Sequence, residues 1–315
     1  MLPVDHIRRA VLLSPLILLS DCRRRKEESG MGDALTQELS DFLDASRTGL
    51  ADGKLTLINK NLRDSQLAAI LTDPRVGALT QLDLQINQLS ALGVQRLAKS
   101  PRLQTLQSLC LSMNPLRDAG IQALSQAPWL RQLTLLLARS CGGTAAGVRT
   151  LATALAGGAI RSLDLGGQEV QAAGLVELPL TLLALHEAHL DGAAARELIA
   201  HGHMKSLTLS RAPLGAGALV GLPGIAPGLY SLTLDQTELA DQDVMALAAR
   251  PAPALEHLSL QYCSLRDDGV RALARAPWLH QLKTLTLAFK GDALPSQKAC
   301  DELRGAYGDR PGLSL

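Results

Sequence analysis

Four histidines between residues 186 and 203 are the first groups in this sequence that could do chemistry. They occur as HEAH (186–189) and HGH (201–203). A zinc site of the H-E-x-x-H type needs two histidines four residues apart on one helical face, with the glutamate beside the metal. HEAH is one residue too short for that motif and follows an alternating pattern that predicts a strand and a turn. We expect solvated turn histidines and predict no metal site.

Two glycine-rich stretches, GGTAAG (142–147) and GAGALVG (215–221), are candidates for phosphate-binding loops. Neither matches G-x-G-x-x-G or a Walker loop that ends in Gly-Lys-Ser/Thr, and no βαβ unit supplies an acidic partner for a ribose. We expect both to be small-residue helix starts. No Ser-His-Asp or Cys-His arrangement can be assembled from the spacing. We therefore predict no catalytic residue and no cofactor, and we expect that the chain is not an enzyme.

The cysteines are widely spaced and include no C-x-x-C pair. This pattern encodes neither a disulfide framework nor a zinc site. We expect reduced thiols in a reducing compartment. The five residues are Cys22, Cys110, Cys141, Cys263 and Cys300.

The first residues have two features of an export signal. Arg8 and Arg9 precede the apolar run AVLLSPLILLS (10–20), and Cys22 follows it. This order is typical of secretory and lipoprotein signals, in which such a cysteine is lipidated. Export or lipid anchoring through residues 1–22 is therefore one interpretation.

Other features of the same segment oppose export. Asp21 stands where a lipoprotein cleavage site needs a small residue, and RRRK (23–26) places positive charges on the side to be exported. The apolar run is also too short to span a bilayer. We expect a cytoplasmic protein whose residues 1–30 are a signal-like or disordered segment. Contact with a membrane is expected only if Cys22 is lipidated.

The composition excludes several classes of protein. With 47 % hydrophobic residues, the chain of 315 residues can bury a large core, and global disorder is excluded. Aromatic residues make up only 2 %, and the apolar content is mostly Leu and Ala, which suits many thin, similar layers. The net charge is +1, so the sequence indicates no surface for nucleic acid.

The pattern L-x-x-L-x-L returns from one end of the chain to the other. Its alternation predicts short strands with one face buried. LSL (313–315) follows the last full unit by 28 residues and predicts an eleventh strand. The second and third leucines of the ten units are Leu55/Leu57, Leu82/Leu84, Leu109/Leu111, Leu133/Leu135, Leu163/Leu165, Leu183/Leu185, Leu207/Leu209, Leu232/Leu234, Leu258/Leu260 and Leu285/Leu287.

Helical spacing follows each strand. Leu116, Gly120 and Leu124 are four residues apart and so lie on one helical face, where the small middle residue allows close packing against the strand. Asp118 in RDAG and Asp267 in RDDG stand where a side-chain oxygen can cap the helix that they begin. A single coil of strand and helix buries too little to fold alone, so coils must stack. The same spacing occurs at Val170/Gly174/Leu178 and Leu214/Ala218/Leu222.

A stack of coils needs a cover at each end. Residues 31–51 predict an N-terminal capping helix with Leu35, Leu39, Phe42 and Leu43 on one face. Beyond it, the ten repeats occupy 52–290, and 291–315 form a C-terminal cap with the final strand.

One 15-residue segment occurs in two similar copies. LRDAGIQALSQAPWL (116–130) and LRDDGVRALARAPWL (265–279) share ten of fifteen positions and contain the only tryptophans, Trp129 and Trp278. The two copies lie 149 residues apart, which is six coils, so they occupy the same place in a repeat. The duplication therefore predicts a shared structural role.

Two segments, LTQLDLQINQLSALGVQRLA (79–98) and LQSLCLSMNPLRDAGIQALS (106–125), resemble leucine-rich repeats of the ribonuclease-inhibitor class. The resemblance implies an α/β solenoid, a right-handed horseshoe with a parallel sheet on its concave face and helices on its convex face. The asparagine that ties neighbouring coils together in this family occurs only as Asn87 and Asn114. The C-terminal LRGAYGDRPGLSL is similar to segments that end bacterial members of the class, and so favours a bacterial source.

The residues between and just after the leucines of L-x-L are expected on the concave face of the sheet. Most are small and polar, which suits a broad surface for a partner. Asp83 and Gln85 are candidate binding residues near the N-terminal end. The C-terminal third gathers acceptor, donor and aromatic groups, which are common anchors of interfaces. Its candidate partner-binding residues are Asp235, His257, Gln261, Tyr262 and Phe289.

These features together predict a non-catalytic interaction module that binds a protein or peptide on its concave face. Two alternatives stay open. Activators of the Ran GTPase share this repeat type, so a GTPase regulator is a candidate by analogy of fold alone. The other alternative is a membrane-anchored lipoprotein with a structural or binding role, which depends on Cys22.

Overall fold

The chain divides into two compact units, 1–45 and 46–315. In the first unit, the described residues Ser40 and Leu43 are helical. The predicted signal-like segment with Cys22, and most of the predicted N-terminal capping helix, lie outside the described residues. Within the described residues, none of the helices is both long and apolar enough to cross a membrane. The computed structural model describes residues 40, 43, 47–201, 203–290 and 294–315.

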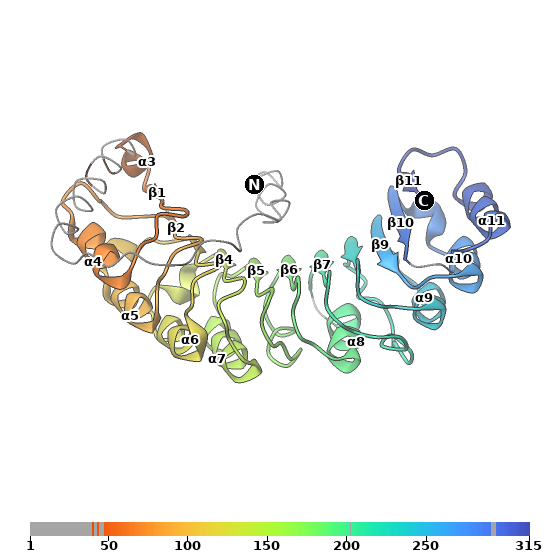
Figure 1. Ribbon diagram of the computed structural model, residues 1–315, viewed down its shortest axis with the longest axis horizontal. Helices are drawn as coiled ribbons and strands as arrows, with labels where there is room; N and C mark the ends of the chain where they lie inside the picture. The colour runs from red at the N-terminus through yellow and green to blue at the C-terminus, as the bar shows by residue number, and fades with distance from the viewer. Residues whose placement is uncertain (1–39, 41–42, 44–46, 202, 291–293) are drawn as a thin grey trace, which may run out of the picture. The chain divides into compact units, whose positions relative to one another are not determined.

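The described part of residues 46–315 forms one parallel sheet whose strands follow chain order (Figure 1). Neighbouring strands align equivalent leucines, so that Leu55 pairs with Leu82 and Leu82 with Leu109. The predicted α/β solenoid is therefore confirmed. The strands are β1 (Lys54–Thr56), β2 (Gln81–Asp83), β3 (Ser108–Cys110), β4 (Leu135–Leu137), β5 (Ser162–Asp164), β6 (Leu182–Ala184), β7 (Ser206–Thr208), β8 (Ser231–Thr233), β9 (His257–Cys263), β10 (Thr284–Phe289) and β11 (Leu313–Ser314).

Helices cover one face of this sheet, and the unit curves so that the strands lie on its inner side (Figure 1). We call the uncovered face of the sheet the inner face. The α-helices are α3 (Arg47–Ala51), α4 (Asp64–Thr72), α5 (Ala91–Lys99), α6 (Arg117–Ser125), α7 (Ala145–Leu155), α8 (Gly192–Ala200), α9 (Asp241–Ala248), α10 (Asp267–Ala274) and α11 (Gln297–Tyr307). Short 3₁₀ turns are η1 (Pro101–Leu103), η2 (Leu130–Gln132) and η3 (Leu279–Gln281).

The leucines of L-x-L form the core between sheet and helices. Leu57, Leu84 and Leu111 are fully buried and stack as one row along the solenoid. Burying one such side chain stabilises the fold by about 1.5–3 kcal/mol. Because each row is shared between neighbouring coils, the coils are stable as a stack.

The predicted register of the fourth strand is wrong by one residue. The expected pair was Leu133 and Leu135, but Leu136 aligns with Leu109 and Leu163, and Ala138 is the second buried residue. The sequence LTLLLA supports either alternation, and a slip of one residue moves every side chain to the other face. The repeat lengths on either side of this strand are consequently 27 residues each, in place of 24 and 30.

Two repeats contain no α-helix. The described residues that connect β7 to β8 form turns, so the helix expected to start at GAGALVG is wrong. Gly215, Gly217 and Gly221 have φ angles of +78°, +87° and +82°. A right-handed helix cannot contain this left-handed backbone.

The repeat between β5 and β6 is only 20 residues long and also forms turns, so the helix expected around Val170, Gly174 and Leu178 is wrong. Gly174 has a φ angle of +87° there. The other glycine-rich stretch, GGTAAG, does start a helix, because Thr144 immediately precedes α7.

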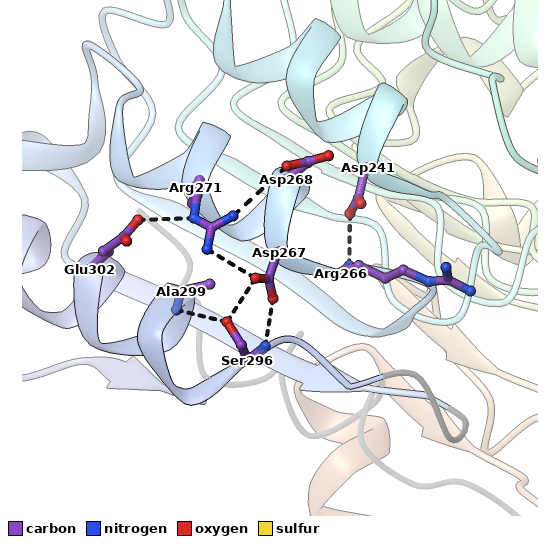
Figure 2. A network of polar contacts seen from close by, with 8 residues as sticks. All are labelled: Asp241, Arg266, Asp267, Asp268, Arg271, Ser296, Ala299 and Glu302. Carbon is purple, nitrogen blue, oxygen red and sulfur yellow. Dashed lines mark hydrogen bonds and ion pairs between the residues drawn. The ribbon is translucent and has the colours of Figure 1, made fainter.

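The aspartates at the helix starts bind the next helix and not their own. Asp118 accepts hydrogen bonds from the backbone N (2.8 Å) and Oγ1 (2.7 Å) of Thr144, the residue before α7. Asp267 binds Ser296 before α11 in the same way, while Arg271 pairs with its carboxylate at 3.0 Å (Figure 2). A Cβ at Gly147 would overlap the Asp118 carboxylate. The glycine thus leaves room for the previous helix's aspartate.

The two family asparagines connect neighbouring coils as the resemblance implies. Asn114 is buried, accepts from the backbone N of Leu89 at 3.0 Å and donates to the backbone O of Leu84 and of Leu111, both at 2.9 Å. In the coil with the corrected register, Cys141 takes this place, and its Sγ contacts the Leu111 O at 3.3 Å. Small polar or thiol groups therefore satisfy part of the same backbone elsewhere.

Candidate functional site

The inner face carries the side chains that alternate with the core leucines. On β9 and just after β8 these include Asp235, Ser259 and Gln261. The Asp235 Oδ1 accepts hydrogen bonds from the Ser259 Oγ at 2.6 Å and from the Gln261 backbone N at 2.8 Å. The structure thus brings together two of the predicted residues, Asp235 and Gln261, and holds the carboxylate in one orientation.

Tyr262 lies at the edge of the inner face where the strands end. Its φ angle is +56°, and it interrupts the pairing of β9 with β10, in which Gln261 aligns with Ala288 and Cys263 with Phe289. This irregularity turns the ring outward, and Tyr262 is 49 % exposed. Phe289, also predicted, is half-buried on the neighbouring strand.

The predicted His257 lies at the opposite edge, where the strands begin, in a cluster that the sequence did not reveal. Its Nε2 is 2.7 Å from the Tyr230 hydroxyl, and its Nδ1 is 2.7 Å from the Thr284 Oγ1. The Tyr230 and His257 rings meet edge to face at 4.7 Å. Lys283 lies 6.0 Å from the Tyr230 ring centre and pairs with Glu256. Tyr230 is equivalent to positions that elsewhere hold small or charged residues, and only a register alignment of the repeats could have singled it out.

Asp83 and Gln85, the other predicted residues, lie far from this patch. The Gln85 backbone N donates to the Asp83 Oδ1 at 3.0 Å on β2. Strand β2 is six strands from β8, which corresponds to about 29 Å along a sheet. These two residues therefore belong to a separate part of the inner face.

Burial raises the thiol pKa of each described cysteine. Cys110, Cys141, Cys263 and Cys300 are free and buried. Burial raises the pKa of Cys110 and of Cys141 to about 12. Both thiols therefore stay protonated, and the thiolate that cysteine chemistry requires is not formed.

HEAH follows β6 as a turn, and its first histidine faces the middle of the inner face. The pKa of His186 is lowered to about 4, mainly by burial and also by the charges of Arg139 and Arg211, although the charge of Glu187 acts in the opposite direction. Glu187 bridges Arg139 (3.2 Å) and Arg211 (3.0 Å) beside it. In the described ranges, no three His, Cys, Asp or Glu residues are arranged to hold a metal ion. His186 is therefore a neutral imidazole at physiological pH.

His186 gives a pH dependence that can be measured. Its folded pKa of about 4 lies below its ordinary value of 6.5, so the unfolded chain binds more protons between these pH values. The free energy of unfolding is expected to fall as the pH is lowered from 6.5 to 4, by at most about 1.4 kcal/mol per pH unit. Chemical denaturation of the wild type and of His186→Gln over this range isolates the effect. Equal slopes for the two proteins would contradict it.

Comparison with protein families identifies the repeats. A family model described as leucine-rich repeat matches residues 102–125 and 253–274. The first match contains β3 and α6, and the second contains β9 and α10. These two matched segments are leucine-rich repeats. No curated protein matches the chain.

Several solved structures are similar to this chain at low identity. The matched chain of the mouse RP105/MD-1 complex is 17 % identical, with 79 % of this chain and 44 % of that chain covered and a TM-score of 0.49. Internalin C2 of Listeria monocytogenes is 19 % identical, with 82 % of this chain and 92 % of that chain covered and a TM-score of 0.45. The matched chain of the yeast complex of Rad7 and Elc1 is 15 % identical, with 89 % of this chain and 76 % of that chain covered and a TM-score of 0.48. This chain spans less than half of the matched mouse chain, and likeness at this level assigns it no activity or partner.

Proposed function

We propose that this leucine-rich-repeat chain is a non-catalytic interaction module that binds a protein or peptide on its inner face. The C-terminal patch, defined as Tyr230, Asp235, His257, Gln261 and Tyr262, is the main contact. The proposal concerns the face and the residues that bind, and leaves the partner's name to experiment.

The observation that carries this proposal is a polar floor between two exposed tyrosines. Tyr230 is 39 % exposed at one edge of the inner face, and Tyr262 is exposed at the other. Between them, hydrogen bonds fix Asp235 and His257 in place. Tyrosines supply large, rigid contact area with a polar tip, which makes them frequent anchors of interfaces. Side chains that are already ordered lose little entropy when a partner binds.

The described exposed apolar side chains outside the inner face contain no tyrosine. They include Leu92 on α5 and Met245 on α9, which are single residues on separate helices. Scattered apolar residues of this kind are normal on protein surfaces. They provide matched controls for variants of the inner face.

The test is affinity capture from the source organism's lysate with three proteins. The double variant Tyr262→Ala/Gln261→Ala removes an aromatic anchor and an amide but leaves every backbone hydrogen bond of β9. It is expected to fold normally and to lose at least 90 % of the partner that the wild type recovers, about 1.4 kcal/mol or more of binding energy. The control variant Leu92→Ala/Met245→Ala should recover the partner fully. Equal recovery of the partner by both variants, or its loss only in the control variant, would contradict the proposal that the partner binds on the inner face.

Three finer assignments belong to the same proposal. We place the repeats in the ribonuclease-inhibitor-like class because strands alternate with full α-helices in most coils. A bacterial source is supported by the C-terminal segment, which forms α11 and β11. A cytoplasmic location is supported by the free thiols of the described cysteines. Cell fractionation with and without residues 1–30 tests the location, and recovery of acylated Cys22 in membranes would overturn it.

A further inference from the structure

The centre of the inner face differs from the rest because leucines point outward there. Leu135 and Leu137 on β4 and Leu182 on β6 are half-buried at positions that alternate with the core leucines. Equivalent positions on the other strands hold mainly Ser, Thr, Gln or Asp. Between β4 and β6, Asp164 aligns with Leu137 on one side and with Ala184 on the other. We call Leu135, Leu137, Ser162, Asp164, Leu182 and Ala184 the central block.

The Asp164 carboxylate therefore stands among aliphatic side chains. It is only 8 % exposed, and its Oδ1 accepts one hydrogen bond, from the Gly166 backbone N at 2.9 Å. Within the described part of the chain it forms no ion pair, whereas acids outside the block, such as Glu187 and Asp267, pair with arginines. Asp164 is thus a carboxylate without a cation of its own.

The surroundings of Asp164 disfavour its charge. Burial raises its pKa, although the Gly166 hydrogen bond and the charge of Arg139 act in the opposite direction. Arg139 is itself engaged with Glu187 at 3.2 Å. A cation that arrived beside Asp164 would relieve this cost, because an opposite charge nearby favours the ionised carboxylate.

The next row of the inner face supplies a buried ring nitrogen without a partner. The His186 Nε2 is buried and has no hydrogen-bond partner among the described residues. A neutral imidazole can accept a hydrogen bond at one nitrogen. Gly166 aligns between Arg139 and His186, and the Arg139 side chain passes close to it. The block therefore combines an aliphatic rim with acceptors that need an N–H donor.

We propose that the central block is a docking site for a lysine or arginine side chain of a protein or peptide partner. The cationic head binds Asp164, and the alkyl stem packs on Leu137 and Leu182. Long basic side chains have this combination of an apolar stem and a charged head. Arg161 and Lys205 are exposed at the edge where the strands begin. Because these cations repel another cation, the basic side chain of the partner enters from the middle of the inner face. This site rests on the proposed function, since it names the chemistry that the inner face would recognise.

The test uses two labelled 12-residue peptides, one alternating Leu and Lys and the other alternating Leu and Glu. Fluorescence anisotropy with the full chain is expected to show at least tenfold tighter binding of the Lys peptide. Asp164→Asn should weaken that binding about tenfold, because asparagine keeps an oxygen for Gly166 and removes only the charge. Leu182→Ser should also weaken it. Asp268→Asn, which removes an equal charge from the exposed start of α10, should change binding less than twofold.

Each other outcome overturns the site. Equal binding of both peptides, or no binding of the Lys peptide, contradicts selection of a cation. Equal effects of Asp164→Asn and Asp268→Asn would show that the peptide senses only overall charge. If Asp164→Asn leaves peptide binding unchanged while Tyr262→Ala/Gln261→Ala abolishes it, the proposal that the central block docks a basic side chain is wrong. The proposed function then stands. If no inner-face variant changes binding of a peptide that does bind, both are wrong.

Discussion

Replacing Trp129 with alanine is expected to lower the free energy of unfolding by about 3–5 kcal/mol. The indole is 1 % exposed, and its Nε1 donates to the backbone O of Leu97 in the preceding helix at 3.3 Å. Trp278 repeats the arrangement, with its Nε1 2.9 Å from the Arg250 O. Each tryptophan therefore fills the space between coils and donates to a carbonyl in or just beyond the helix of the previous coil. Equilibrium unfolding in urea measures the loss.

Two further variants separate this structural role from others. Trp278→Ala should cost a similar amount, because the two sites are equivalent. Leu92→Ala, on the exposed side of α5, should change the unfolding free energy by less than about 0.5 kcal/mol. A loss below about 1 kcal/mol for either tryptophan would contradict the account of the doubled stretch as scaffold.

The second large effect is expected at Asp243. Its carboxylate binds the turns that join β7 to β8, in the repeat that lacks an α-helix. Asp243 is fully buried in α9, and its carboxylate accepts from the backbone N of Gly217 (2.9 Å), Leu219 (2.8 Å) and Ala240 (2.9 Å). Gly217 and Leu219 belong to the turns that join β7 to β8. Asp243→Ala leaves three N–H groups without an acceptor, that of Leu219 buried and those of Gly217 and Ala240 partly buried. It should lower the unfolding free energy by about 3 kcal/mol or more. Denaturant unfolding measures this change.

Asp243→Asn is the informative companion variant. It retains one acceptor oxygen and should lose less stability than alanine. Asp268→Ala, at an exposed position where the side chain is 79 % accessible, should be neutral within about 0.5 kcal/mol. If alanine and asparagine at position 243 were equally mild, the carboxylate would not be what holds the turns in place.

The strands could be predicted because their signal is local. In every unit but one, the leucines of L-x-L are the buried residues of the strand. The exception, β4, has leucine on both faces, so alternation alone could not fix its register. The two missing helices escaped prediction for another reason: apolar residues at i, i+4 and i+8 are also compatible with turns, and the φ angles of Gly174 and Gly217 depend on the fold around them.

The candidate site was predictable only in part. Asp235 and Gln261 were found because alternation places them on the inner face, and the structure joins them at 2.8 Å. Tyr230 lies one residue before β8, and only an alignment of the strand register could have identified it. The central block was hidden by the error at β4, which assigned Leu136 to the inner face in place of Leu135 and Leu137. The roles of these residues in binding are still predictions.

The most direct test of inner-face binding is hydrogen–deuterium exchange of the full chain, alone and with the partner that it captures. The expected result is slower exchange in β8, in β9 with Tyr262, in β10 and in the turn that contains Gln236, with helices α5 to α10 unchanged. Slower exchange confined to those helices, with the strands unaffected, would contradict the proposal.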